Sequence, residues 1–348
     1  MKNVAIVGFG GQGNWHFQTT KEQKDIKVIG AFDIDDNRVD FMKKQGIKAY
    51  CSLDEILNDD AVDIVVCATP NDSHKDIVIR SLRAGKNVIC EKPVTMTVEA
   101  LDQMIEVANE TGKLFSVHQN RRWDSDFLCM KSIADSKELG EVIRIESRVH
   151  GSRGIPGDWR GTKAAGGGMI LDWGVHLIDQ ILCMFQDDTV VKVWCETTHI
   201  TNTEVDDGFR LELTFQSGKT AYIEVGTYNF INLPRFYMQC TEGTALIEDW
   251  VKDATVVKMT EWGEKDAIPV QTAAGITKTM APRAKNNIQT YIKPKPQSDV
   301  FDYYRNFVAT IDNKEDSIIK LSQVRRCMCV MQAAFDSSES QQVLKVNI

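Results

Sequence analysis

The segment Val4–Gly13, with the sequence VAIVGFGGQG, decides the architecture of the first part of the chain. Its apolar half belongs to a run from Asn3 to Phe9 that has the length and composition of a buried strand. Its glycines follow the spacing GxGxxG, and a helical pattern from Gly13 to Glu22 comes next. Such a glycine pattern is common by chance, but the strand before it and the helix after it predict a strand, a tight turn and a helix in succession.

This arrangement is typical of a turn that holds the pyrophosphate of a dinucleotide. Gly8 permits the tight turn, Gly10 lets backbone amides approach the phosphates, and Gly13 allows the helix to pack closely on the strand. Gln12 lies in the same turn, and the start of the helix directs free amides and a positive dipole at the anion. The alternative is a glycine-rich turn without a ligand, which this context disfavours.

An acidic residue in the next strand indicates which dinucleotide is bound. The strand Ile26–Asp33 ends about 20 residues after the glycine turn, the usual spacing for such an acid. Asp33 is expected to accept hydrogen bonds from the adenine ribose and to repel the 2′-phosphate of NADP, so NAD is favoured. Arg38 is near enough to reach a phosphate, and NADP therefore stays open.

Strands and helices continue to alternate as far as Arg121. Continuous apolar strands followed by helices imply right-handed crossovers and a parallel sheet that is covered on both faces. We therefore predict an α/β domain over residues 1–121, a doubly wound Rossmann sheet. The further strands are Asp63–Ala68, Asn87–Cys90 and Lys113–His118, and the further helices are Asn37–Gln45, Ser73–Ala84 and Thr97–Thr111.

The pattern changes to longer strands with a period of two, which predicts an α+β domain over residues 122–348. Turn signals between the strands suggest an antiparallel meander. The segment Gly263–Pro296 is rich in Lys, Thr and Pro and is expected to be a loop, for which an arm against a neighbouring subunit is one role to test. The expected strands are Glu141–His150, Val190–Ile200, Gly208–Gln216, Lys219–Tyr228 and Phe236–Thr241, with helices at Asp124–Ser136, Asp299–Ile311 and Leu321–Ser337.

Composition limits the possible partners and compartment. A chain of 348 residues exceeds what one core normally supports, and a net charge of -8 argues against nucleic acid or an anionic membrane as partner. The nine cysteines are irregularly spaced, which favours reduced thiols over disulfides or a metal site. No signal peptide and no membrane-spanning run is recognised, so a cytoplasmic protein is expected.

The stretch Gly166–His176, GGGMILDWGVH, carries a carboxylate and an imidazole four residues apart. If Gly168–Met184 is a helix, Asp172 and His176 share one face. A carboxylate beside an imidazole is the arrangement that a general base needs near neutral pH. The alternative, equally compatible with the sequence, is that Asp172 and His176 merely satisfy each other's hydrogen bonds in the interior and have no catalytic role.

Two polar segments follow strands at the carboxyl edge of the first sheet, where ligands of open α/β sheets bind. Glu91-Lys92-Pro93 follows one strand, and the Lys92 cation there could polarise a reacting oxygen. The alternative is a surface lysine in a turn. Thr69-Pro70-Asn71 and His74 follow another strand and are expected to line the nicotinamide half of the cofactor.

Together these motifs resemble a known family. The glycine turn is followed in order by Thr69-Pro70-Asn71-x-x-His74, Glu91-Lys92-Pro93, Asn120-Arg121-Arg122, Trp159-Arg160 and Asp172-x-x-x-His176. This set strongly resembles the glucose–fructose oxidoreductase / inositol dehydrogenase / MocA (Gfo/Idh/MocA) family, over roughly the first half of the chain. The resemblance implies a Rossmann domain followed by an α+β domain with a large open antiparallel sheet, and a homo-oligomer (dimer or tetramer).

The resemblance also implies residue roles. Lys92 would fix and polarise the substrate oxygen, His176 would be the acid/base and Asp172 its partner. The implied substrate-binding residues are Lys92, Asn120, Asp172 and His176. The expected cofactor-binding residues are Gly8, Gly10, Gln12, Gly13, Asp33, Arg38, Thr69, Pro70, Asn71, His74, Glu91, Lys92, Trp159 and Arg160.

The leading hypothesis is reversible NAD-dependent oxidation of a secondary alcohol on a cyclic polyol, sugar or glycoside. Hydride would pass to the nicotinamide while His176 removes the hydroxyl proton. One alternative is a sugar reductase, or an enzyme that retains and recycles its cofactor. Another is a non-catalytic nicotinamide-binding redox sensor, which would need the glycines and Asp33 but not Lys92, Asp172 and His176.

Overall fold

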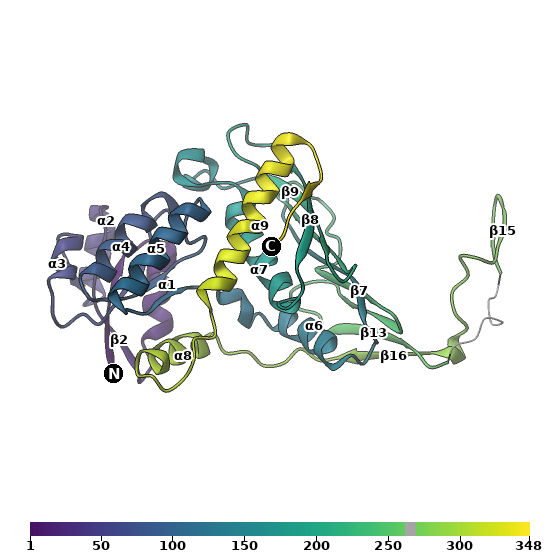
Figure 1. Ribbon diagram of the computed structural model, residues 1–348, viewed down its shortest axis with the longest axis horizontal. Helices are drawn as coiled ribbons and strands as arrows, with labels where there is room; N and C mark the ends of the chain where they lie inside the picture. The colour runs from purple at the N-terminus through teal and green to yellow at the C-terminus, as the bar shows by residue number, and fades with distance from the viewer. Residues whose placement is uncertain (262–268) are drawn as a thin grey trace.

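The computed structural model describes residues 1–261 and 269–348. Two sheet-containing domains lie side by side, and the C-terminal helix α9, Leu321–Ser340, lies between them (Figure 1). Over the described residues, no helix is both long and apolar enough to cross a membrane.

The first domain is a parallel sheet with the strand order β3-β2-β1-β4-β5-β6, which confirms the predicted doubly wound fold. The sequence missed β3 and α3 because each is too short for a periodic pattern to emerge. The strands are β1 Lys2–Val7, β2 Ile26–Phe32, β3 Lys48–Ala49, β4 Ile64–Cys67, β5 Asn87–Cys90 and β6 Phe115–Val117. The helices are α1 Gly11–Thr20, α2 Asp36–Lys44, α3 Leu53–Leu57, α4 His74–Arg83 and α5 Val98–Thr111.

The second domain is built on a mostly antiparallel sheet with the order β16-β13-β12-β11-β7-β10-β9-β8-β17. The large antiparallel sheet is confirmed, but the meander is wrong, because β7 lies between β10 and β11 and runs parallel to β10. The strands are β7 Val142–His150, β8 Val190–Thr198, β9 Gly208–Phe215, β10 Thr220–Gly226, β11 Phe236–Cys240, β12 Gly243–Ile247, β13 Ala254–Met259, β16 Ile288–Lys293 and β17 Leu344–Lys345.

The predicted loop Gly263–Pro296 is also corrected by the structure. Its C-terminal part is β16, the edge strand that pairs with β13, and a short hairpin of β14 Val270–Thr272 and β15 Gly275–Thr277 precedes it. Edge strands keep one side in solvent, so β16 is polar enough to resemble a loop in sequence. The hairpin projects away from both sheets (Figure 1). Residues 263–268 of that prediction lie outside the described residues.

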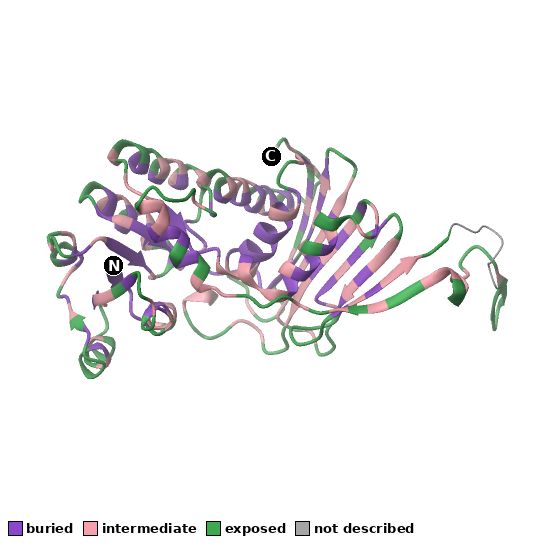
Figure 2. Ribbon diagram, turned by 90° about the horizontal axis from the view of Figure 1, so that it is seen from below, coloured by how far each residue is buried: buried purple, intermediate pink, exposed green. Residues whose placement is uncertain are grey.

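Helices cover one face of the second sheet. These are α6 Ser125–Ser136, α7 Val175–Met184 and α9 Leu321–Ser340, while α8 Phe301–Ile311 lies against the first domain. Along β10, the buried residues Ala221, Ile223 and Val225 alternate with half-buried ones, as a sheet covered on one face requires. Figure 2 shows the same alternation in neighbouring strands.

The C-terminal helices connect the two domains. Arg325 of α9 pairs with Asp102 of α5 at 2.6 Å, and Ser337 of the same helix accepts a hydrogen bond from the backbone of β8. On α8, the Tyr303 hydroxyl donates to Ser116 of β6 at 3.2 Å. The edge of the first sheet is therefore held against the second domain, and the candidate site lies along this junction.

Candidate active site

The glycine turn has the shape that a phosphate-binding loop needs. Gly8 has φ +88°, and a Cβ there would lie 2.7 Å from the Ala68 carbonyl oxygen. A Cβ at Gly13 would lie 2.0 Å from the Gly8 carbonyl oxygen, so only glycine lets α1 approach β1 this closely. By contrast, nothing lies within 4 Å of a Cβ at Gly10, which leaves open space beside the start of α1 at Gly11. The turn therefore fits a dinucleotide pyrophosphate.

Asp33 lies directly beside this turn, at the carboxyl end of β2. Its Oδ2 accepts a hydrogen bond from the Phe9 amide at 2.6 Å, and its Oδ1 accepts one from the Asp35 amide at 2.9 Å. These bonds hold the carboxylate where a ribose would reach it. Arg38 is exposed on α2, the next helix.

The segment after β4 mainly holds the two domains and the loops in place. Asn71 is buried, and its amide donates to the Gly166 carbonyl of the second domain at 2.8 Å. His74 is fully buried, with its ring nitrogens 3.0 Å from the Pro93 carbonyl and 2.9 Å from the Thr69 carbonyl. Both ring nitrogens of His74 are thus engaged by backbone carbonyls, and its place in the cofactor site stays a prediction. Thr69 and Pro70 remain at the edge of the sheet.

Lys92 and Asp172 form an ion pair that bridges the two domains. Lys92 Nζ lies 3.2 Å from Asp172 Oδ1 and 3.1 Å from the Asp172 carbonyl oxygen. The two side chains are only 12% and 16% exposed. Arg160 Nε lies 3.4 Å from Asp172 Oδ2, and its guanidinium also covers the Trp159 ring at 4.7 Å. Three residues predicted from separate motifs thus meet at one point.

The segment that carries Asp172 is a π-helical turn, Ile170–Gly174, and α7 begins only at Val175. The expected pairing of Asp172 with His176 is not seen among the hydrogen bonds of the described residues, where the Asp172 carboxylate contacts Lys92 and Arg160 instead. Asp206 anchors this turn by accepting the Ile170 amide at 2.8 Å, and its burial raises the pKa of that carboxyl to about 7.

His176 lies at the start of α7 and is 5% exposed. Its Nδ1 is buried and has no hydrogen-bond partner in the part of the chain that the structure describes. Burial, followed by the positive charges of Lys92 and Arg121, holds the pKa of His176 well below its usual value. The ring is therefore neutral near pH 7.

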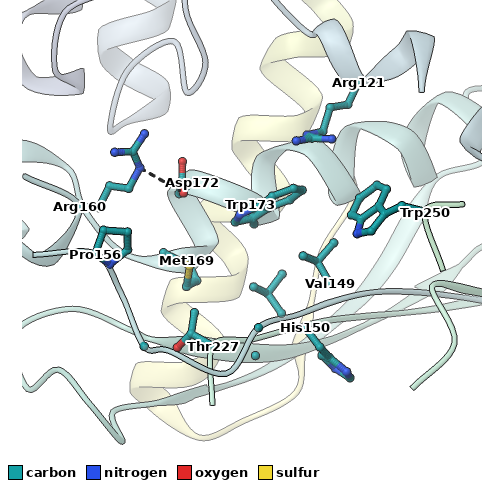
Figure 3. A pocket seen from close by; sticks show the side chains of 14 residues that line it. Arg121, Val149, His150, Pro156, Arg160, Met169, Asp172, Trp173, Thr227 and Trp250 are labelled. Carbon is teal, nitrogen blue, oxygen red and sulfur yellow. Dashed lines mark ion pairs between the residues drawn. The ribbon is translucent and has the colours of Figure 1, made fainter. Parts of the chain in front are cut away.

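A cavity of about 470 Å³ opens beside Asp172 (Figure 3). Arg160 and Asp172 lie at one end, and Arg121, Trp173 and Trp250 form the other. The Arg121 guanidinium lies 4.2 Å from the centre of the Trp173 ring, and the two indole rings are 6.0 Å apart. Sequence reasoning missed Trp250, which follows β12 and carries no local signal of a binding residue.

Two further predicted residues lie at the same edge of the first sheet. Asn120 follows β6, and its Oδ1 is buried without a partner among the described residues. Glu91 is 4% exposed and lies behind Lys92, whose backbone amide donates to Glu91 Oε2 at 3.2 Å. Its other oxygen faces two buried histidines rather than the cavity.

Comparisons with known families cover most of both domains. The model of the oxidoreductase family with an NAD-binding Rossmann fold (Gfo/Idh/MocA) matches residues 2–119. The model of the Gfo/Idh/MocA C-terminal domain matches residues 127–246. The first match ends at residue 119 and the second begins at residue 127, on either side of the change in sequence pattern near Arg121.

Individual relatives agree with these matches. The crystal structure of an NAD-binding protein from Listeria innocua superposes with a TM-score of 0.96, at 43% identity and over 99% of each chain. An uncharacterised oxidoreductase of Schizosaccharomyces pombe is 39% identical over 49% of this chain, and the match spans 47%, about half, of that relative's length. The scyllo-inositol 2-dehydrogenase (NADP+) of Bacillus subtilis is 29% identical over 76% of this chain and 71% of its own.

Proposed function

The chain belongs to the Gfo/Idh/MocA family of oxidoreductases with an NAD-binding Rossmann domain, and from that premise we propose that it oxidises a secondary alcohol of a cyclic polyol, sugar or glycoside, reversibly and with NAD as cofactor. The observation that carries the proposal is the bridging ion pair of Lys92 and Asp172. It joins the cofactor domain to the end of a cavity large enough for a small molecule.

The lining of the cavity supports a ring-shaped, hydroxylated substrate. Trp173 and Trp250 offer flat apolar faces to the C–H surface of a ring, while Arg160 and Asp172 offer hydrogen bonds to its hydroxyls. The B. subtilis relative is named for a substrate of this class, scyllo-inositol. We propose a substrate of that class for this chain, without proposing scyllo-inositol in particular.

Each residue of the site has a defined task in the proposed reaction. Lys92 donates a hydrogen bond to the substrate oxygen and stabilises the negative charge that develops there as the proton leaves. His176 accepts that proton on a ring that its lowered pKa keeps neutral before the reaction. Asp172 and Arg160 hold Lys92 and the substrate in one orientation. The glycine turn and Asp33 would hold the dinucleotide, whose nicotinamide would supply the hydride acceptor.

NAD is the proposed cofactor because a carboxylate at position 33 disfavours a 2′-phosphate. The relative from B. subtilis is named for NADP+, so both dinucleotides belong in the assay.

The proposal is tested by following reduced nicotinamide by absorbance, with inositols, aldoses and glycosides as substrates. We expect a substrate-dependent rise that is lost in Lys92→Met, which keeps the length of the side chain without its charge. His176→Ala should lower turnover roughly 10²-fold, the usual contribution of one general base. Wild-type turnover in either variant would contradict the assigned roles.

A further inference from the structure

One aromatic ring packs directly on the proposed general base. The Trp173 indole contacts the His176 imidazole edge to face, with ring centres 5.9 Å apart and an interplanar angle of 67°. His176 lacks the hydrogen bond that orients the base in a carboxylate–imidazole pair, because its buried Nδ1 has no partner among the described residues. The Asp172 carboxylate, the expected partner, contacts Lys92 and Arg160 instead. Packing therefore orients the imidazole, and Trp173 supplies the aromatic part of that packing.

Cations and a second indole hold the Trp173 ring in place. The Arg121 guanidinium covers it with Cζ 4.2 Å from the ring centre, which is a cation–π distance. The Trp250 ring lies 6.0 Å from Trp173, and Arg235 Cζ lies 4.7 Å from the centre of the Trp250 ring. These contacts form one continuous series that ends at His176.

Gln180 ties both arginines to the helix that carries the base. Its Nε2 donates to the Arg121 carbonyl oxygen at 2.7 Å, and its Oε1 accepts from Arg235 Nη2 at 3.1 Å. Gln180 is buried and lies on α7, one turn after His176 and on the same face. The aromatic series and the base are therefore anchored on one face of one helix.

Each guanidinium is itself held by a carboxylate. Arg121 Nη1 donates to Asp124 Oδ2 at 2.9 Å, and Arg235 Nε lies 3.1 Å from Asp126 Oδ2. The side chains of Arg235 and Asp126 are each 3% exposed, so opening this pair would leave an unpaired buried charge. The two indoles are therefore packed against side chains that have little freedom to move.

We propose that Trp173 is the positioning residue of His176 and holds the imidazole in the orientation that proton transfer from the substrate needs. This inference rests on the proposed function and adds a residue to it. Trp173 also lines the cavity, so a substrate ring that packs on this indole is placed by the same group that orients the base. In a carboxylate–imidazole pair, the carboxylate performs that task.

The electrostatics of the site agree with a base that is oriented without a carboxylate. Burial lowers the pKa of His176, and the positive charges of Lys92 and Arg121 lower it further. A carboxylate partner would have the opposite effect, because it favours the imidazolium form. The imidazole is therefore neutral before the reaction, and a contact with an indole orients it without requiring a charge on the ring.

A double-mutant cycle separates the positioning of the base from general packing. Trp173→Leu should lower kcat roughly 10- to 100-fold, at most the contribution of the base itself. In the His176→Ala background, the same substitution should change kcat by less than about twofold, since no base remains to be positioned. Trp173→Phe keeps an aromatic ring and should retain most of the wild-type kcat. Trp194→Leu removes an indole from β8, away from the cavity, and should leave kcat unchanged in both backgrounds. Equal losses from Trp173→Leu in the two backgrounds would overturn the proposal.

A second measurement does not need turnover. The chain has six histidines, and NMR of histidine-labelled protein resolves their ring protons, with His176→Ala to assign the signals of that ring. The ring current of Trp173 should displace the His176 signals, so we expect them to move in Trp173→Leu and to stay in place in Trp194→Leu. Unmoved His176 signals in Trp173→Leu would overturn the proposal whether or not the dehydrogenase activity is found. Displaced signals without activity on any substrate would contradict the proposed function, whereas activity with equal losses in the two backgrounds would contradict the positioning role alone.

Discussion

Substitutions at two glycines of the phosphate-binding turn test the stability of the fold and the binding of the cofactor separately. Gly13→Ala would place a methyl group 2.0 Å from the Gly8 carbonyl oxygen and 3.2 Å from Ile6 Cγ2. Neither the strand nor the helix can yield easily, because both belong to the core of the first domain. Gly10→Ala meets nothing within 4 Å, and Gly10 has φ −72°, which alanine also adopts. The added methyl group points instead into the space that the phosphates need.

The magnitudes follow from these contacts. Overpacking at Gly13 costs about 1–3 kcal/mol, which lowers the melting temperature by roughly 2–12 °C at about 2–4 °C per kcal/mol. For Gly10→Ala the fold should stay within about 0.5 kcal/mol of the wild type. Losing one amide hydrogen bond to a charged phosphate costs about 1.5–3 kcal/mol, so the Kd for NAD should rise roughly 10- to 150-fold.

The assay is thermal unfolding of each variant without cofactor, followed by titration with NAD and calorimetry. We expect Gly13→Ala to melt earlier, and Gly10→Ala to melt like the wild type but to bind NAD weakly. Wild-type affinity in Gly10→Ala would refute the assignment of this turn to the pyrophosphate. An unchanged melting temperature in Gly13→Ala would refute the packing argument.

Three further predictions test the cofactor carboxylate, the aromatic wall and the anchor of the π turn. Asp33→Asn keeps an acceptor for the Phe9 amide but removes the negative charge. The ratio of kcat/KM for NAD to kcat/KM for NADP should therefore fall roughly tenfold. An unchanged ratio would show that Asp33 does not select the cofactor. Trp250→Ala should raise KM for the polyol roughly tenfold with little change in kcat, and an unaltered KM would remove Trp250 from the substrate site. The pKa of Asp206 is about 7 in the folded state, above its unfolded value of about 3.9. The protonated carboxyl therefore stabilises the fold below about pH 4, and this contribution is lost as the pH rises through about 7. Denaturant unfolding at several pH values should show a loss on the order of 4 kcal/mol from this group that is absent in Asp206→Asn, and parallel curves for both proteins would contradict the raised pKa.

Local patterns were sufficient for most of the first domain because each of its longer elements carries its own signal, which β3 and α3 are too short to do. The apolar run before Gly8, the GxGxxG turn and Asp33 lie within one short segment, and the structure keeps them together. Strand β16 was missed for the opposite reason. It gains its order from pairing with β13, and one side of it faces solvent, so its own composition resembles a loop.

The site was predictable only in part, because several of its contacts depend on distant residues. Lys92 and Asp172 were both expected, and the structure brings them together. The pairing of Asp172 with His176 was expected from their spacing alone, whereas the Asp172 carboxylate meets Lys92, 80 residues away, and Arg160. The Glu91 carboxylate contacts histidines 75 and 27 positions away, and no local pattern reports such a contact.

The central claim is that this chain moves a hydride directly from a secondary alcohol carbon to its nicotinamide at the Lys92–Asp172 centre. The most direct test uses a polyol that is active in the substrate screen and carries deuterium on its secondary carbons. Mass spectrometry of the reduced nicotinamide should find the deuterium there in the wild-type reaction, with no labelled product formed by Lys92→Met. Reduced nicotinamide without deuterium, or label transfer at the wild-type rate in Lys92→Met, would contradict the account.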